Sequence, residues 1–450
     1  MSLPAPPPPG VPGPPGTVPS ASPASTAPGP PAPDVRCPLL PVLLVTLLAS
    51  FGTGLFWHGL GFIAESVHGF SPADNLVLFA VMGAAYVAGA FSTHRLTAAL
   101  GRIASPRSIL AGTLLVQAAA CVPVAIWSGA WTLWLAALVA TVASSLTWPL
   151  VEAYLAAGRH GPAMRRAIAA FNFTWMPAVA APMFVVGPRM DELGAGTIAL
   201  MAPLALVAAL AVAWMPRRPG THDEELAAVS TGPSYPYLLR SARVLLPLSY
   251  VLTSAMSPLL PFRFRDLGVA VEWATPATTT WMAARIAILF LMWRLPVWHG
   301  RWDVLLAGGL ATVVGFAGVM TLPTLPLVIV AFAVFGAGLG VVYYAALYYG
   351  MAVGRAGVDA GGTHEGLIGL GYCLGPLVAL IGVSGSVRGA AEADGAAGEA
   401  DGLGGVTTAI LLLVGVSALG TIRAVRPWRE DRRRAAAQAE RDAAADEGPG

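Results

Sequence analysis

The chain has 450 residues, of which 56% are hydrophobic and 11% are charged. A soluble domain carries about 25% charged residues, so this composition excludes a water-facing surface over most of the chain and indicates a membrane protein. The formal net charge of +2 is too small to indicate a nucleic-acid-binding protein. The three cysteines, Cys37, Cys121 and Cys373, follow no spacing typical of a disulfide framework or a metal site.

Residues 1–36 consist almost entirely of Pro, Ala, Gly and Ser. Such a segment buries too little apolar surface to offset its ordering entropy, so we expect a disordered cytoplasmic tail and no secretory signal. Apolar segments of about 20 residues or more, long enough to span a bilayer, follow the tail. We expect twelve spans, at residues 38–66, 73–94, 107–128, 131–156, 165–188, 195–215, 241–263, 274–295, 303–322, 325–352, 364–385 and 404–424.

The expected spans form two sets of six, at residues 37–215 and 241–424, with a polar cytoplasmic linker at 216–240 and a charged cytoplasmic tail at 425–450. Arginines gather in alternate loops, for example Arg95 and Arg102 after the second span, whereas acidic residues such as Glu192 gather in the others. Because loops rich in basic residues stay in the cytoplasm, we expect a multi-pass protein of the plasma membrane with both termini cytoplasmic.

Two related sequences lie about 195 positions apart, as in a transporter built from two related halves. The first is Trp148-Pro149-Leu-Val-Glu152, and the second is Tyr343-Tyr344-Ala-Ala-Leu-Tyr348-Tyr349. Each is followed by a polar turn and a further span, which carries Asn172 in the first copy and Glu365 in the second. A weaker match pairs the irregular stretches at residues 56–59 and 258–261.

Twelve spans in two sets of six, a polar central linker and Gly101-Arg102 after the second span resemble the major facilitator superfamily. The Asp of that family's usual loop signature is missing here, which leaves its charge latch without a counterpart. The resemblance implies two pseudo-symmetric six-helix bundles in a bacterial inner membrane. It further implies that spans 1, 4, 7 and 10 line the cavity, that spans 2, 5, 8 and 11 form the interface, and that the others face lipid.

Titratable side chains inside a membrane span are functional candidates by default. Arg285 lies in the middle of the eighth span, where it could hold an anion or gate the pathway, or could be a packing residue satisfied by carbonyls or an acid. Glu152 lies in the fourth span and suits proton coupling. Its alternative role is an ion pair with Arg165 or Arg166.

Three further polar side chains each allow two interpretations. Glu365 opens the expected eleventh span, where a carboxylate could cap the first turn or could belong to the pathway. Asn172 could form a hydrogen bond across the interface or contact the solute. His58 is either a titrating pathway residue or a hydrogen-bonded packing residue.

Aromatic side chains supply the remaining candidates. Trp148 should line the cavity. The four tyrosines of the second copy cover most of a helix circumference, so not all of them can face one cavity, and we expect two of them to line it; these four are Tyr343, Tyr344, Tyr348 and Tyr349. Gly369, Gly371 and Gly375 have helical spacing that predicts close helix approach, and not a nucleotide loop.

These features predict an all-α membrane protein that transports a small organic solute by alternating access, as a secondary active transporter with the proton as candidate coupling ion. The solute is neutral or amphipathic, or an organic anion held by Arg285. The alternative is a transport-inactive receptor or scaffold on the same fold. Solute and lipid bilayer are the expected partners; we expect no enzyme activity, no cofactor, no metal ion and no nucleic acid.

Overall fold

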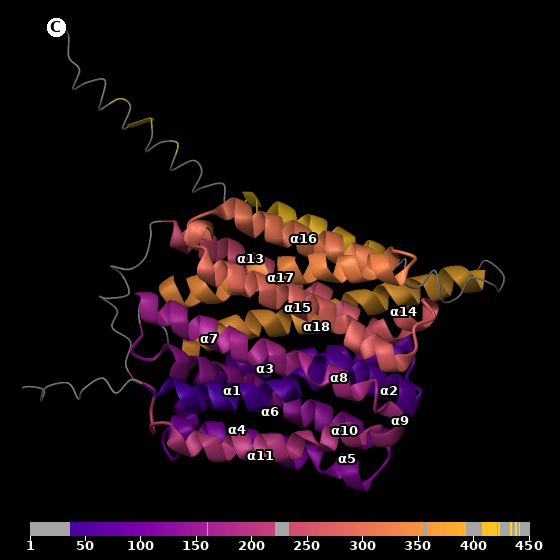
Figure 1. Ribbon diagram of the computed structural model, residues 1–450, viewed down its shortest axis with the longest axis horizontal. Coiled ribbons are helices and arrows are strands. Elements are labelled where there is room, and N and C mark those ends of the chain that lie inside the picture. Colours follow the sequence, from indigo (N-terminus) through magenta and orange to yellow (C-terminus); the bar gives the residue numbers. More distant parts are fainter. Residues whose placement is uncertain are drawn as a thin grey trace, which may run out of the picture. The chain divides into compact units, whose positions relative to one another are not determined.

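The computed structural model describes residues 37–159, 161–220, 234–353, 358–392 and 407–420, together with residues 422, 423, 433, 437, 438 and 441. Every regular element within these residues is a helix (Figure 1), which confirms the all-α expectation. We call residues 37–220 the N-terminal half and residues 234–420 the C-terminal half. Both belong to one unit, Val35–Gly450.

The helices follow the expected spans in chain order. The N-terminal half contains α1 (Leu39–Gly54), η1 (Leu55–Gly59), α2 (Leu60–His68), α3 (Pro72–Leu100), α4 (Pro106–Cys121), α5 (Pro123–Ile126), α6 (Ala130–Ala156), α7 (Gly161–Ala180), α8 (Met183–Val186), α9 (Met190–Leu193), α10 (Gly196–Ala199), α11 (Met201–Ala211) and η2 (Val212–Trp214). The C-terminal half contains α13 (Tyr235–Met256), η3 (Ser257–Leu259), α14 (Leu260–Asp266), α15 (Val271–Arg294), η4 (Pro296–Trp298), α16 (Trp302–Thr321), α17 (Leu325–Val353), α18 (Val358–Glu392) and a last helix, Thr407–Gly420.

Ten helical segments of the described chain are long and apolar enough to cross a bilayer, so the protein is a multi-pass membrane protein. They coincide with the expected spans 1 to 7 and 9 to 11. The expected eighth span is α15, a helix of 24 residues that carries Arg285 in its middle. The expected twelfth span coincides with the shorter apolar helix Thr407–Gly420.

Local sequence signals set several helix ends. Gly69 adopts φ 66° directly after α2, a left-handed conformation that glycine takes without a steric penalty. Ser71 then accepts a hydrogen bond from the Asp74 N–H while the Asp74 carboxylate accepts one from the Ser71 N–H, which forms a capping box at the start of α3. Pro72 occupies the first turn, where its missing N–H costs nothing.

Three helix boundaries differ from expectation. α3 runs to Leu100, whereas the second span was expected to end at residue 94. α13 begins at Tyr235, inside the expected linker, and α18 begins at Val358, before the expected start at residue 364. Hydropathy marks only the apolar part of a helix, and backbone hydrogen bonding continues past it into polar residues. The expected N-terminal tail, most of the linker and most of the C-terminal tail lie outside the described residues.

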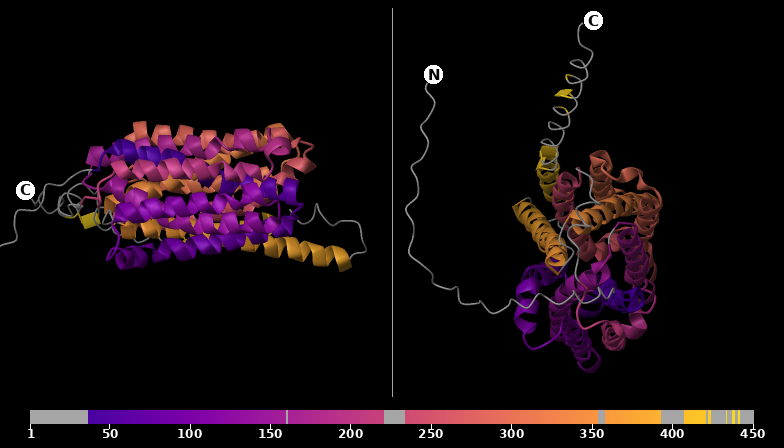
Figure 2. Two further views of the ribbon diagram at one scale, coloured as in Figure 1. Left: turned by 90° about the horizontal axis from the view of Figure 1, so that it is seen from below. Right: turned by 90° about the vertical axis from the view of Figure 1, so that its left-hand side faces the viewer.

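The helices run roughly parallel, with the two halves on opposite sides and α18 against the N-terminal half (Figure 2). Contacts between the halves are made mainly by α3 with α18, and also by α7 with α15 and by α6 with α18. Spans 2, 5, 8 and 11 therefore meet at the interface, as expected, and span 4 contributes as well. We call the end where α1 and α13 begin the proximal end, and the end where α2 and α14 finish the distal end.

Glycines allow the closest helix approaches. A Cβ atom on Gly83 of α3 would lie 2.4 Å from the backbone of Tyr372, and one on Gly369 of α18 would lie 2.9 Å from the Tyr86 ring. Gly371 and Gly375 meet the backbone of α13 in the same way. The expected role of the glycine stripe is therefore confirmed, and α18 is held tightly against helices of both halves.

Candidate functional site

A cavity of about 40 Å³ lies between the two halves. Eight aromatic side chains line it, with Thr53, Ile368 and Glu365 as the other lining residues; the aromatic set is Trp57, Tyr86, Trp148, Phe171, Trp175, Tyr250, Tyr343 and Tyr372. These residues come from α1, η1, α3, α6, α7, α13, α17 and α18. The spans expected to line the cavity do so, and spans 2, 5 and 11 contribute as well.

Aromatic rings of the two halves contact one another across the interface. Trp57 of the N-terminal half lies flat on Tyr372 of the C-terminal half, with ring centres 3.6 Å apart. Tyr86 and Tyr250 meet Tyr372 edge-on at 5.7 and 5.2 Å. On another wall, Trp175 and Tyr343 lie 5.3 Å apart. The cavity therefore offers aromatic faces and edges from both halves to a bound molecule.

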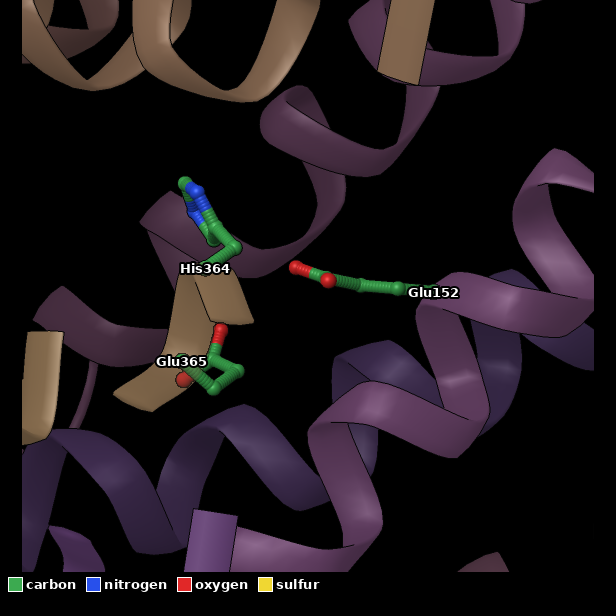
Figure 3. A group of neighbouring side chains, drawn as sticks. All are labelled: Glu152, His364 and Glu365. Atoms are coloured by element: carbon green, nitrogen blue, oxygen red, sulfur yellow. The ribbon is translucent and has the colours of Figure 1, made fainter. Parts of the chain in front are cut away.

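Glu152 of α6 extends toward His364 and Glu365 of α18 (Figure 3). One ligand-type atom from each of the three side chains lies within 4.8 Å of the other two. The side chains are buried, with exposed fractions of 3% for Glu152, 8% for His364 and 6% for Glu365. The Tyr86 hydroxyl donates a hydrogen bond to Glu365, whereas no donor reaches either oxygen of Glu152, and His364 Nε2 has no hydrogen-bond partner.

This arrangement brings two carboxyl groups together where little solvent is present to screen them. At 4.8 Å, two unit negative charges repel by about 3–4 kcal/mol with an effective dielectric constant of about 20. A proton or a bound cation that neutralises one or both carboxylates would remove this repulsion. The pair bridges the halves, so its charge state acts directly on the contact between α6 and α18.

The position of Glu365 overturns the capping interpretation. α18 begins at Val358, so Glu365 lies beyond its first turn, away from the free amides at the helix start. Gly361, one turn before Glu365, has the Glu152 carboxylate at 2.8 Å from the point where a Cβ would be. A glycine at this position therefore makes room for the acidic side chain of the opposite half.

Arg285 is 2% exposed and is surrounded by aromatic rings. Its guanidinium carbon lies 4.3 Å from the Tyr343 ring centre and 4.8 Å from that of Trp175, and it donates a 3.4 Å hydrogen bond to the Tyr250 hydroxyl. Its Nε has no hydrogen-bond partner, and it forms no ion pair with the described residues. Arg285 contacts three cavity-lining residues, Trp175, Tyr343 and Tyr250, but does not itself line the cavity.

Two other candidate residues, His58 and Asn172, have their polar atoms close to polar groups of neighbouring residues. His58 lies in the π-helical turn η1, with Nδ1 3.3 Å from the Ser257 hydroxyl and its ring edge-on to Trp281. Asn172 donates to the Ile168 carbonyl and accepts from Trp175 Nε1 at 3.0 Å, so it orients a cavity-lining ring within its own helix. Neither side chain lines the cavity.

Of the tyrosines in α17, Tyr343 lines the cavity, so the expectation of two lining tyrosines is wrong. Tyr344, Tyr348 and Tyr349 instead pack around Trp298, with ring centres 5.2–5.7 Å from it. Successive residues of a helix are rotated by about 100° around its axis, and this is why neighbouring tyrosines face different directions. Glu152 likewise forms no ion pair with Arg165 or Arg166, both of which are exposed.

The halves are joined at the distal end by polar contacts that sequence analysis missed. Asn75 of α3 donates to the Pro258 carbonyl at 3.2 Å. Thr275 of α15 donates to the Met183 carbonyl at 2.6 Å and accepts from the Gly187 N–H at 3.0 Å. Asn75 and Thr275 are each one of several polar residues in their helices, and only the partner across the interface distinguishes them. With the His58–Ser257 contact they form what we call the distal seal.

A larger hollow of about 540 Å³ lies between α3, α4 and α6. Its lining is almost entirely apolar and includes Leu100, Ile109, Val116, Leu138 and Leu146. It has neither titratable side chains nor aromatic rings, so we assign the chemistry to the smaller cavity between the halves.

Comparison of the sequence with known family models and with curated proteins finds no significant match. Comparison of the fold does find matches. The nucleoside transporter NupG is 16% identical, with a TM-score of 0.60 over 86% of this chain and 98% of that one. The human organic anion transporter MFSD10 is 15% identical, with a TM-score of 0.61 over 87% of this chain and 100% of that one.

The chain therefore shares the fold of these transporter structures. A bacterial homologue of the human lysosomal transporter Spinster, in an inward-facing and occupied conformation, also matches at 15% identity and a TM-score of 0.57, over 86% of this chain and 96% of that one. At these identities the likeness concerns the fold. The resemblance drawn from the sequence is confirmed at that level.

Proposed function

We propose that the protein is a secondary active transporter that moves a small organic solute by alternating access and couples its movement to protons. The observation that carries the proposal is the buried pair of Glu152 and Glu365, which come from opposite halves beside an aromatic cavity. Charge on this pair decides whether α6 and α18 repel each other or pack. A proton-coupled transporter needs a contact of this kind, at which proton binding shifts the equilibrium between conformations that differ in how the two halves pack.

The cavity is too small for an organic solute in this conformation. Its volume of about 40 Å³ suits a few water molecules, whereas sites for small organic ligands measure about 300 Å³ or more. The halves must therefore separate before a solute enters. The distal seal holds one end closed, and the α6–α18 contact closes the cavity toward the proximal end. We propose that deprotonation of the carboxyl pair opens the proximal end by repulsion.

Aromatic lining favours a solute with a planar ring. Stacking on Trp57, Trp175 or Tyr372 would supply affinity through ring faces, while Glu365 and the tyrosine hydroxyls supply polar contacts. The structural neighbours include a nucleoside transporter and an organic anion transporter. We therefore take planar heteroaromatic solutes as the class to test first. An organic anion held directly by Arg285 is less favoured, because Arg285 does not line the cavity in this conformation.

The distribution of arginines supports a proximal end in the cytoplasm. Arg102, Arg165 and Arg240 are exposed at or near proximal helix ends. The positive-inside rule then places both chain termini in the cytoplasm of a bacterial cell.

Flux into proteoliposomes tests the proposal. Purified protein would be given labelled nucleosides and aromatic carboxylates, with and without an imposed pH gradient and with chelator throughout. We expect gradient-driven accumulation of at least one solute to fall at least tenfold in Glu152→Gln and Glu365→Gln, since neither amide can carry the proton. Solute exchange without a gradient should persist in both variants.

The matched control is Glu192→Gln, which changes an exposed distal carboxylate paired with Arg189. Accumulation that is unchanged in both pathway variants would contradict coupling at the pair. If the folded wild-type protein moves no solute, and a cellular phenotype disappears on removal of the tails, the receptor or scaffold alternative would replace the transporter.

A further inference from the structure

We propose that Glu152, His364 and Glu365 form a binding site for a divalent first-row transition-metal ion that bridges the two halves of the protein. Sequence analysis anticipated no metal ion, because no ligand spacing along the chain indicates one. The fold brings the three side chains together from α6 and α18. The binding claim stands apart from the proposed transport activity; only its consequence for transport depends on that proposal.

The first argument is the open coordinating capacity of the cluster. Both Glu152 oxygens and His364 Nε2 are buried without a hydrogen-bond partner. Unpaired buried polar atoms are costly, and native structures leave few of them without a ligand, a water or an ion. The unpaired atoms of this cluster lie on both sides of the interface, so one ion could satisfy atoms from both helices.

The second argument is the donor set. Carboxylates and imidazole are both ligands of transition-metal ions, and sites with three protein ligands leave a further position open. Ca²⁺ and Mg²⁺ prefer oxygen ligands alone, so the imidazole favours Zn²⁺, Mn²⁺, Co²⁺ or Fe²⁺ over these ions. A doubly charged ion also balances two carboxylates fully, whereas a single proton leaves one negative charge buried.

The surroundings of the cluster fit this role. Tyr86 donates a hydrogen bond to Glu365, as the outer partners of metal-binding carboxylates do. The His364 ring packs edge-on against Tyr343 at 5.6 Å. The positive charges that act on His364 are those of the Arg285 and Arg243 guanidinium groups. Arg285 is held by aromatic faces and Arg243 is exposed, so neither competes for the carboxylates by an ion pair.

Only a small movement separates this arrangement from a bound one. The ligand atoms lie within 4.8 Å of one another, and atoms around an ion at 2.0–2.2 Å are about 3.4 Å apart in a tetrahedral site. Rotation of the flexible Glu side chains covers this difference. Gly361 leaves the space in which the Glu152 carboxylate moves. A bound ion would draw α6 and α18 together and stabilise the conformation in which the halves are closed.

Metal binding to the purified full-length chain tests the site without any transport measurement. Chelator-treated protein in detergent would be titrated with Co²⁺, whose visible absorption reports its ligands, and with Zn²⁺ by calorimetry. We expect one ion per chain and an affinity at least tenfold lower in Glu152→Gln, Glu365→Gln and His364→Ala. Mg²⁺ and Ca²⁺ should not displace Co²⁺. His68→Asn, at the distal end of α2, is the matched histidine control.

A second pair of variants guards against loss of folding. Gly361→Ala should weaken Co²⁺ binding, since its Cβ would press on the Glu152 carboxylate, whereas Gly350→Ala meets no atom within 4 Å and should bind normally. Thermal unfolding and gel filtration would confirm that each variant is folded. Absence of Co²⁺ and Zn²⁺ binding by folded wild-type protein would overturn the proposal, as would equal binding by the three ligand variants. Proton-coupled flux measured in chelator would survive either result.

Discussion

The guanidinium of Arg285 contacts the rings of both Trp175 and Tyr343 and donates a hydrogen bond to the Tyr250 hydroxyl. Each cation–π contact contributes about 0.5–2 kcal/mol, which offsets part of the several kcal/mol that burying a charge costs. No acid among the described residues forms an ion pair with it. The side chain therefore positions two cavity-lining rings at a net cost to stability.

This balance makes a prediction for Arg285→Met. Its melting temperature should equal or exceed that of the wild-type protein, because an apolar chain of similar length avoids the desolvation cost. Its solute flux should fall at least tenfold, because Trp175 and Tyr343 lose the cation that orients them. Arg285→Lys keeps the charge without the planar fork and should not restore flux. A large loss of thermal stability with normal flux per folded molecule would show a packing role.

At the scale of elements, the irregular turns of α1–α2 and of α13–α14 lie opposite one another. The π-helical turn Leu55–Gly59 and the 3-10 turn Ser257–Leu259 bring His58 within 3.3 Å of the Ser257 hydroxyl. The weak sequence match between these stretches thus corresponds to a matching interruption in both helices. Together with Asn75 and Thr275, they make the distal seal out of short, directional contacts between the halves.

Removing one seal contact should open the distal end more often. Thr275→Val keeps the shape but leaves the buried Gly187 N–H without its acceptor. The cost is about 1–3 kcal/mol, which corresponds to a shift in population of about 5- to 150-fold. We expect faster maleimide labelling of Thr53→Cys from the distal side, in a chain whose native cysteines are replaced. Thr279→Val, one turn further along α15, removes only a bond to Pro276 within the helix and serves as control. Equal labelling rates in both variants would contradict the seal.

At the scale of the whole molecule, exposed arginines such as Arg102, Arg165 and Arg240 lie at or near proximal helix ends. This asymmetry predicts that both chain ends lie in the cytoplasm. Epitope tags at the two ends should resist protease added to intact spheroplasts and should be cut in inverted membrane vesicles. Cutting of one tag in spheroplasts would mean an odd number of spans and would remove the basis for two related halves.

The sequence by itself determined the membrane class, the order of the helices and the close approach of α18, because hydropathy and glycine spacing are local properties of the chain. It also drew attention to Glu152, Glu365 and Arg285, since a charge inside an apolar helix is costly wherever the helix packs.

Only the tertiary structure decided which of these side chains meet. Glu152 and the His364–Glu365 pair belong to different halves and come together because α6 packs against α18, a contact that no spacing along the chain encodes. The same holds for Tyr86, whose hydroxyl reaches Glu365 across the interface. Helix rotation likewise separated Tyr343 from its neighbours. The direction of a side chain and the partner that it meets depend on packing between distant parts of the chain. Hydropathy and residue spacing along one sequence do not report that packing.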